Sequence, residues 1–249
     1  KLQTVQDYEC YVQSAELRMA ARKAFLAADA NPALIEQLVG GEKIQTILGN
    51  GPNPHKISGA MIYDWIGTVF IPGANVDRTV RMLQDYDHRA QYFSEIISTS
   101  KLACRTGEGR FGFTMRLKEP AVIDSDNDVV WEKLDAHRWR CRSYSTRVRE
   151  VEKEKGYLLR INSYWRFSET EKGVFVEGQT ITLSGEFGSF MRTLGSIMKI
   201  NPEKSLKKTL GAMRETLLKH AAEFPKAPAG LPDCGEPVRI SACTMPSSK

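Results

Sequence analysis

The stretch NPEKSLKKTLGAMRETLLKHAAEF, residues 201–224, has the pattern of one long amphipathic helix, and it decides the fold. Asn201 is a favourable N-cap residue, and Pro202 suits the first helical position because that N–H would have no helical partner anyway. The apolar residues recur every three or four positions and form one stripe, which consists of Leu206, Leu210, Met213, Leu217 and Ala221. This helix spans roughly 31 Å, and burying five such side chains contributes on the order of 10 kcal/mol. It therefore needs a broad apolar partner.

The preceding residues alternate in a way that predicts an antiparallel sheet as this partner. Seven strand-like runs are joined mostly by turn-rich stretches, and they cover residues 57–71, 96–105, 109–118, 128–135, 138–149, 157–168 and 173–185. A helical segment, 75–93, follows the first of them. The clearest alternation places four apolar side chains on one face, namely Phe111, Phe113, Met115 and Leu117. Such a pattern is typical of a sheet with one apolar face and one solvated face.

The last two runs form a hairpin that brings polar groups onto the apolar face. A turn at 169–172 would pair Trp165 with Glu177 and Ser163 with Gln179. Besides these four, the predicted apolar face contains Leu159, Ile161, Phe167, Phe175, Ile181 and Leu183. The opposite face, predicted to be solvated, contains Arg160, Asn162, Tyr164, Arg166, Thr180 and Thr182.

The polar groups on this face favour a cavity lining over a solid core. An unpaired buried charge costs several kcal/mol, whereas a binding cavity combines apolar walls with a few polar groups that orient a guest. Arg147 on the preceding strand is a candidate partner for Glu177. Two alternatives stay open: the hairpin register is off by one residue, or Glu177 is an edge residue that reaches water.

Five stretches, taken in order, point to a known architecture: DWIGTVFIPG (64–73), LQDYDHRAQYF (83–93), SYWRFSE (163–169), VFVEGQTITLS (174–184) and NPEKSLKKTLGAMRETL (201–217). Over about residues 57–224 the chain resembles the START-like or Bet v 1-like superfamily (SRPBCC), with polyketide cyclase-type and lipid-transport-type members the most similar. The resemblance implies an α+β helix-grip fold, in which a curved antiparallel sheet of about seven strands wraps around a long C-terminal helix and leaves a tunnel between them.

The domain organisation follows from this resemblance and from composition. Residues 1–56 are predicted to form an N-terminal helical extension, 57–224 the helix-grip domain and 225–249 a Pro-rich tail. The extension contains a helical pattern over 3–29 and a shorter one from Asn31. Because about 40 residues are marginal as an independent core, we expect it to pack on the main domain.

Composition limits the partners. The net charge of +5 is mild, and nucleic-acid binding would require a stronger charge bias and interleaved aromatic residues, so we predict no nucleic-acid partner. The four histidines share no metal-ligand spacing, and we predict no metal and no cofactor. The chain begins at Lys1, and a removed signal peptide is one explanation. If the protein is exported, to the periplasm or outside the cell, we expect a disulfide between Cys234 and Cys243; otherwise it is cytoplasmic.

The resemblance predicts a hydrophobic small molecule or lipid as the ligand. The predicted ligand-binding residues are Tyr63, Trp65, Phe111, Phe113, Met115, Arg147, Ile161, Trp165, Glu177, Gln179, Phe190, Met191, Leu194 and Met213. Most of these supply apolar wall, and Arg147, Glu177 and Gln179 orient a polar end. The segment 187–198 has two interpretations. It is either a lid that makes transient membrane-surface contact or a short helix that completes the core.

An enzyme of the polyketide cyclase or aromatase type is the alternative, and it would use the same cavity. Its acid or base would be Glu177 or Tyr63, both weak candidates. The stretch Asp85–Arg89 holds five polar residues and is either a general acid–base pair or a helix C-terminus with a cationic last turn. A third interpretation is a cavity collapsed into solid core, with only a protein-interaction surface left.

Overall fold

The computed structural model describes residues 2–41, 45–49, 53–93, 97–107, 110–117, 122–151, 158–185 and 202–220. The helices are α1 (Leu2–Ala21), η1 (Ala28–Ala30), α2 (Pro32–Val39), α3 (Val76–Gln84), η2 (Tyr86–His88), α4 (Arg89–Tyr92) and α6 (Pro202–Lys219). The strands are β1 (Gln45–Leu48), β2 (His55–Ile57), β3 (Ala60–Pro72), β4 (Ile97–Gly107), β5 (Arg110–Leu117), β6 (Ile123–Lys133), β7 (Arg138–Glu150), β8 (Leu158–Thr170) and β9 (Gly173–Gly185).

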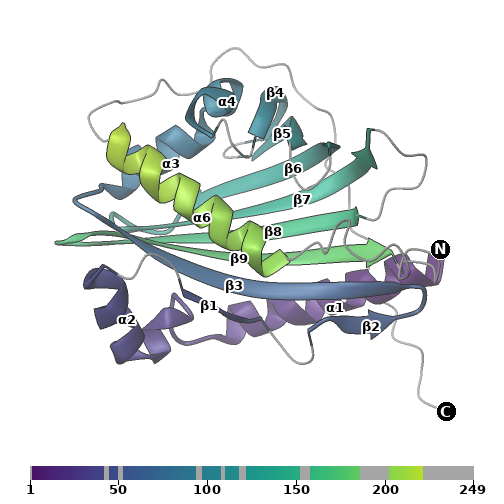
Figure 1. The fold of residues 1–249 in the computed structure, drawn as a ribbon, viewed down its shortest axis with the longest axis horizontal. Helices are drawn as coiled ribbons and strands as arrows, with labels where there is room; N and C mark the ends of the chain where they lie inside the picture. Colours follow the sequence, from purple (N-terminus) through teal and green to yellow (C-terminus); the bar gives the residue numbers. More distant parts are fainter. Residues whose placement is uncertain are drawn as a thin grey trace.

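The strands of the described residues form one antiparallel sheet. Its order is β1-β3-β9-β8-β7-β6-β5-β4, and β2 also pairs with β3. The seven predicted strands correspond to β3 to β9, and β6 begins at Ile123, earlier than predicted. Figure 1 shows the curved sheet with α6 across one face and α1 on the other. The predicted α+β helix-grip fold is therefore confirmed. Because β1 and β2 join the sheet, it also includes residues before 57. The three-part division of the chain stays a prediction.

The predicted apolar stripe of α6 packs on the inner face of the sheet. Four of its members, Leu206, Leu210, Met213 and Leu217, are buried in the main core. The helix approaches β3 closely, because a Cβ added to Gly67 would lie 2.5 Å from Cδ1 of Leu210. Only glycine leaves room for the helix at this point. The Nε of Arg214 also donates to the Phe70 carbonyl at 3.1 Å, which ties the helix to the same strand.

The N-terminal extension covers the outer face of the sheet. Tyr8, Val12 and Ala15 of α1 pack against five buried residues of the sheet, which are Ala60, Ile62, Tyr164, Ile181 and Leu183. A smaller cluster joins Leu26 and Leu38 to the outer face of β3 and β9. The prediction of a solvated outer face is wrong for this part of the sheet, because α1 excludes water from Asn162 and Tyr164. β9 is consequently buried on both faces.

The turn between β8 and β9 is tighter than predicted. Thr170 pairs with Gly173, so two residues form the loop, and Trp165 lies opposite Gly178 instead of Glu177. A shift of one residue turns every side chain of a strand to the other face of the sheet. Of the alternatives left open by the sequence, the shifted register is therefore the one observed.

Cys10 forms a disulfide bond, and Cys141 is a free, buried thiol. The predicted Cys234–Cys243 disulfide lies outside the described residues, and export stays a prediction.

No helix among the described residues is long and apolar enough to cross a membrane. The described residues hold no group of histidine, cysteine or carboxylate side chains that would bind a metal ion.

Candidate functional site

A cavity of about 250 Å³ lies between the inner face of the sheet and α6. Alternating residues of the strands point into it, so β6 contributes Ile123, Ser125, Asn127, Val129 and Trp131. Strand β8, which β7 separates from β6, contributes Ile161, Ser163, Trp165 and Phe167 in the same way. The two-residue period of each strand thus turns these side chains toward α6, which lies across the same face of the curved sheet (Figure 1).

The structure brings six of the predicted ligand-binding residues together on the cavity lining. They are Tyr63, Phe113, Met115, Ile161, Trp165 and Met213. Trp65 and Phe111 belong to the adjacent core but do not line the cavity. Phe190, Met191, Leu194 and the rest of the segment 187–198 lie outside the described residues. Ligand contact by any of these residues stays a prediction.

The indole of Trp165 forms part of the cavity wall because β9 has a glycine opposite it. A Cβ added to Gly178 would lie 2.5 Å from Cζ3 of Trp165. The ring therefore lies over the backbone of β9, where any larger residue would push it away. With the register shifted, it is Gly178 and not Glu177 that meets this side chain.

The polar groups of the lining are mostly neutral hydroxyls. They come from β6 to β9 and from α6, and include Ser125, Ser143, Ser163, Thr180, Thr182, Ser184, Ser205 and Thr209. The Thr182 hydroxyl is buried and has no hydrogen-bond partner in the described part of the chain. An unsatisfied buried hydroxyl costs about 1–3 kcal/mol. A polar atom of a guest or a water molecule would remove this cost.

Arg89 is a lining residue that the sequence analysis did not identify. It begins α4, and its guanidinium lies 3.9 Å from the ring centroid of Tyr86. Its Nε donates to the Leu83 carbonyl at 3.0 Å. Of the two interpretations of Asp85–Arg89, the acid–base pair is not assembled in the cavity. His88 bonds Asp85 at 2.7 Å on the exposed side, and this bond raises the pKa of His88.

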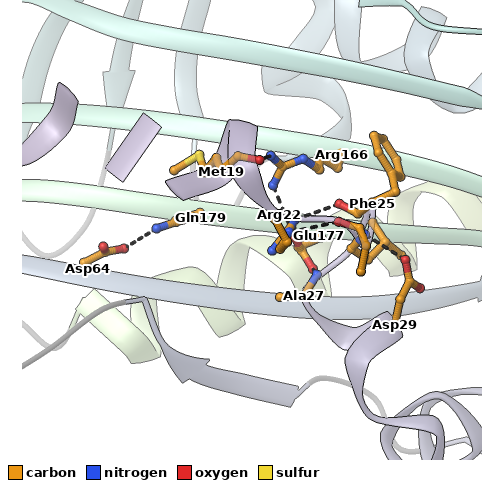
Figure 2. A network of polar contacts seen from close by, with 11 residues as sticks. Met19, Arg22, Phe25, Ala27, Asp29, Asp64, Arg166, Glu177 and Gln179 are labelled. Carbon is orange, nitrogen blue, oxygen red and sulfur yellow. Dashed lines mark hydrogen bonds and ion pairs between the residues drawn. The ribbon is translucent and has the colours of Figure 1, made fainter. Parts of the chain in front are cut away.

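Glu177 does not reach the cavity, so its predicted placement there is wrong. Its carboxylate points to the outer face and holds the N-terminal extension, as Figure 2 shows. One oxygen accepts from Nη2 of Arg22 at 2.7 Å and lies 3.5 Å from Nη1 of Arg166. The other oxygen accepts from the Ala27 N–H. The negative charge of Glu177, which favoured a cavity in the sequence analysis, is instead buried beside the guanidinium groups of Arg22 and Arg166.

The shifted register of β8 and β9 also turns Gln179 outward, so its predicted cavity position is wrong as well. Its Nε2 donates to Oδ1 of Asp64 at 2.7 Å (Figure 2). The other oxygen of Asp64 accepts from the Tyr11 hydroxyl of α1 at 3.0 Å. Burial of this carboxylate raises its pKa above the ordinary value of 3.8.

Asp64→Asn is expected to make the protein more stable, relative to the wild type, at neutral pH than at pH 3. The pKa of Asp64 is higher in the folded protein than the value of 3.8 expected in the unfolded chain, so its proton stabilises the fold at a pH below 3.8. This contribution is lost as the pH rises through the pKa of the folded state. The amide has no such titration and still accepts from Gln179. In urea unfolding from pH 3 to 7, the free energy of unfolding of the variant should increase relative to that of the wild type as the pH rises. A pH-independent difference would contradict this.

Arg147 is also not a cavity residue, and the predicted Arg147–Glu177 pair is wrong. Its exposed side chain bonds Asp126 at 2.7 Å on the outer face of the sheet. The pairing of β6 with β7 is irregular here, because Asp126 pairs with Arg147 whereas Asn127 pairs with Ser145. The extra residue, Thr146, makes a β-bulge that reverses the alternation of β7 beyond it.

The lining offers little acid–base chemistry. Among the described residues, no carboxylate and no histidine lines the cavity. Tyr63, the second weak candidate for catalysis, does line it, and burial raises the pKa of its hydroxyl. This hydroxyl stays protonated at neutral pH, so it donates hydrogen bonds rather than acting as a base.

No protein-family model and no curated protein sequence matches the chain. Several solved structures are similar in fold. A STAR-related lipid transfer protein from Xanthomonas axonopodis has 16% identity and a TM-score of 0.47, over 68% of this chain and 97% of that one. Human STARD10 has 12% identity and a TM-score of 0.48, over 81% and 88% of the two chains.

An aromatase/cyclase, Zhui from Streptomyces sp. R1128, has 10% identity and a TM-score of 0.48, over 64% of this chain and 96% of its own. Because all three TM-scores are below 0.5, these likenesses carry no argument about function. The helix-grip assignment rests on the strand order and on the position of α6 in the structure.

Proposed function

We propose that this protein binds a hydrophobic small molecule or lipid in the cavity between the sheet and α6. The observation that carries the proposal is the cavity itself, about 250 Å³ of space with a largely apolar wall and a buried, unpartnered Thr182 hydroxyl. Protein interiors are normally packed without voids of this size. A guest with an apolar body would recover the lost contacts, and its polar atoms would satisfy the hydroxyls.

The third interpretation, a cavity collapsed into solid core, does not fit this geometry. Leu206 and Met213 of α6 touch the cavity, yet the space between them and β6 is not filled by side chains of the described residues. A void in a core is costly because its lining loses dispersion contacts. We infer that the void is kept for a ligand.

The enzymatic alternative gains no specific support. A cyclase would need an acid or base that points inward, and its best candidate, Glu177, is bonded to Arg22 on the other side of the sheet. Tyr63 remains at the cavity as a hydrogen-bond donor. Ligand binding is therefore the function we propose.

Filling the cavity is expected to abolish binding of a neutral hydrophobic dye. Ser143 lines the cavity from β7, and Ser143→Phe would place an aromatic ring in the space that a guest occupies. Nile red fluorescence should rise on titration into the wild-type protein, and this rise should fall at least tenfold with Ser143→Phe. Near-UV circular dichroism checks that the variant is folded.

Thr146→Phe is the matched control, since Thr146 is the exposed bulge residue on the same strand. We expect it to bind the dye like the wild type. Dye binding that Ser143→Phe leaves unchanged, or no dye binding by any of the three proteins, would contradict the proposed function.

A further inference from the structure

Arg89 is the only cationic side chain among the described lining residues of the cavity. It lies where η2 passes into α4, next to Leu83, Tyr86 and Phe113, which also line the cavity. Its guanidinium is held in place by the Leu83 carbonyl and by the ring of Tyr86. The Tyr86 hydroxyl accepts in turn from Nε1 of Trp131 at 3.1 Å, so the aromatic surface beneath Arg89 is itself fixed.

The part of the chain that the structure describes does not neutralise the charge of Arg89. No carboxylate of the described residues forms an ion pair with it, whereas most arginines of β5 to β7 have such a partner, for example Arg116 with Asp124 at 2.6 Å. A guanidinium has five N–H donors, and the Leu83 carbonyl accepts one from Nε and one from Nη2. Arg89 therefore keeps further donors for a guest in the cavity that it lines. A partly buried cation without an anion is costly, and a charge-assisted hydrogen bond to a ligand would offset this cost.

We propose that the ligand is an amphipathic organic anion, with an apolar body that ends in a single carboxylate bound by Arg89. This inference rests on the proposed function and specifies its ligand class. One guanidinium matches one negative charge, whereas a phosphate monoester carries nearly two charges at neutral pH and would lack a second cation among the described lining residues. The apolar body would lie along Phe113, Met115 and Ile161 toward the hydroxyls of β9.

The test compares two ligands that differ only in charge. Decanoate and 1-decanol are titrated at pH 7.5 against protein loaded with Nile red, which is neutral and does not itself require Arg89. Wild-type protein should bind decanoate about tenfold to a hundredfold more tightly than 1-decanol, as expected for one charge-assisted hydrogen bond in a desolvated site. Arg89→Gln should remove this preference and leave the affinity for 1-decanol within about threefold of the wild type.

Two further variants make the result specific. Arg89→Lys keeps the charge and should retain part of the preference for decanoate, even if it loses the bidentate geometry. Arg116→Gln removes an arginine that is paired with Asp124 outside the cavity, and it should behave like the wild type.

The outcomes separate the two proposals. Equal affinity of the wild type for decanoate and 1-decanol would overturn the role of Arg89 while the cavity still binds, and this comparison does not depend on any variant folding. An undiminished decanoate preference in Arg89→Gln would overturn it as well. If neither Nile red nor either ligand binds the wild-type protein, the proposed function itself fails.

Discussion

Glu177→Ala is expected to lower the free energy of unfolding by about 3–5 kcal/mol, the range for removing one partner of a buried ion pair. The Glu177 residue is 1% exposed. Its removal leaves the guanidinium groups of Arg22 and Arg166 close together without an ion-pair partner among the described residues, and leaves the Ala27 N–H without its acceptor. The loss should loosen the N-terminal extension from the sheet, because Arg22 and Ala27 belong to that extension.

Urea unfolding measures this change, and Glu132→Ala provides the control. Glu132 pairs with Arg140 at 2.7 Å, but the two side chains are 43% and 47% exposed, so its loss should cost at most about 1 kcal/mol. Glu177→Gln keeps an acceptor and should be less damaging than alanine. If Glu177→Ala weakens Nile red binding while its stability equals that of the control, the carboxylate acts at the cavity after all.

Leu210→Ala is expected to cost about 2–5 kcal/mol, the range for truncating a fully buried leucine. Leu210 is 0% exposed and lies over Gly67 of β3. The truncation leaves a new void there, which the rigid backbone of β3 fills only in part. The helix that closes the cavity would then be held mainly by Leu206, Met213 and Leu217.

The matched control is Leu218→Ala on the same helix, where the leucine is 39% exposed. It should change stability by no more than about 0.5–1 kcal/mol. Thermal unfolding followed by circular dichroism compares the two variants under identical conditions. Equal effects of Leu210→Ala and Leu218→Ala would show that the predicted stripe does not anchor the helix on the sheet.

The larger elements were predictable from the sequence because periodicity is a local property of the chain. The stripe from Leu206 to Leu217 needs only the helical repeat to show which residues share a face. The alternation of Phe113 and Met115 likewise defines one face of β5 without knowledge of its neighbours. Element order then favoured the helix-grip fold, and the sheet order and the position of α6 confirm it.

The candidate site was only partly predictable, because two local irregularities change which face a residue occupies. The two-residue loop after Thr170 turns Glu177 and Gln179 outward, and the bulge at Thr146 turns Arg147 outward. Neither leaves a clear signal in hydrophobicity. Arg89 was not predicted to line the cavity. It lies in a run of polar residues that usually marks an exposed helix end, and only the fold places it at the cavity.

The sequence by itself determined strands β3 to β9, the amphipathic C-terminal helix and part of the apolar cavity wall. Each of these depends on the spacing of residues within one segment. The tertiary structure decided where the charges lie: Glu177 against Arg22 on the outer face, and Arg89 at the cavity without a carboxylate partner among the described residues. The physical reason is that the environment of a charge is set by segments far apart in the chain, which meet only when the sheet and its two covering layers assemble.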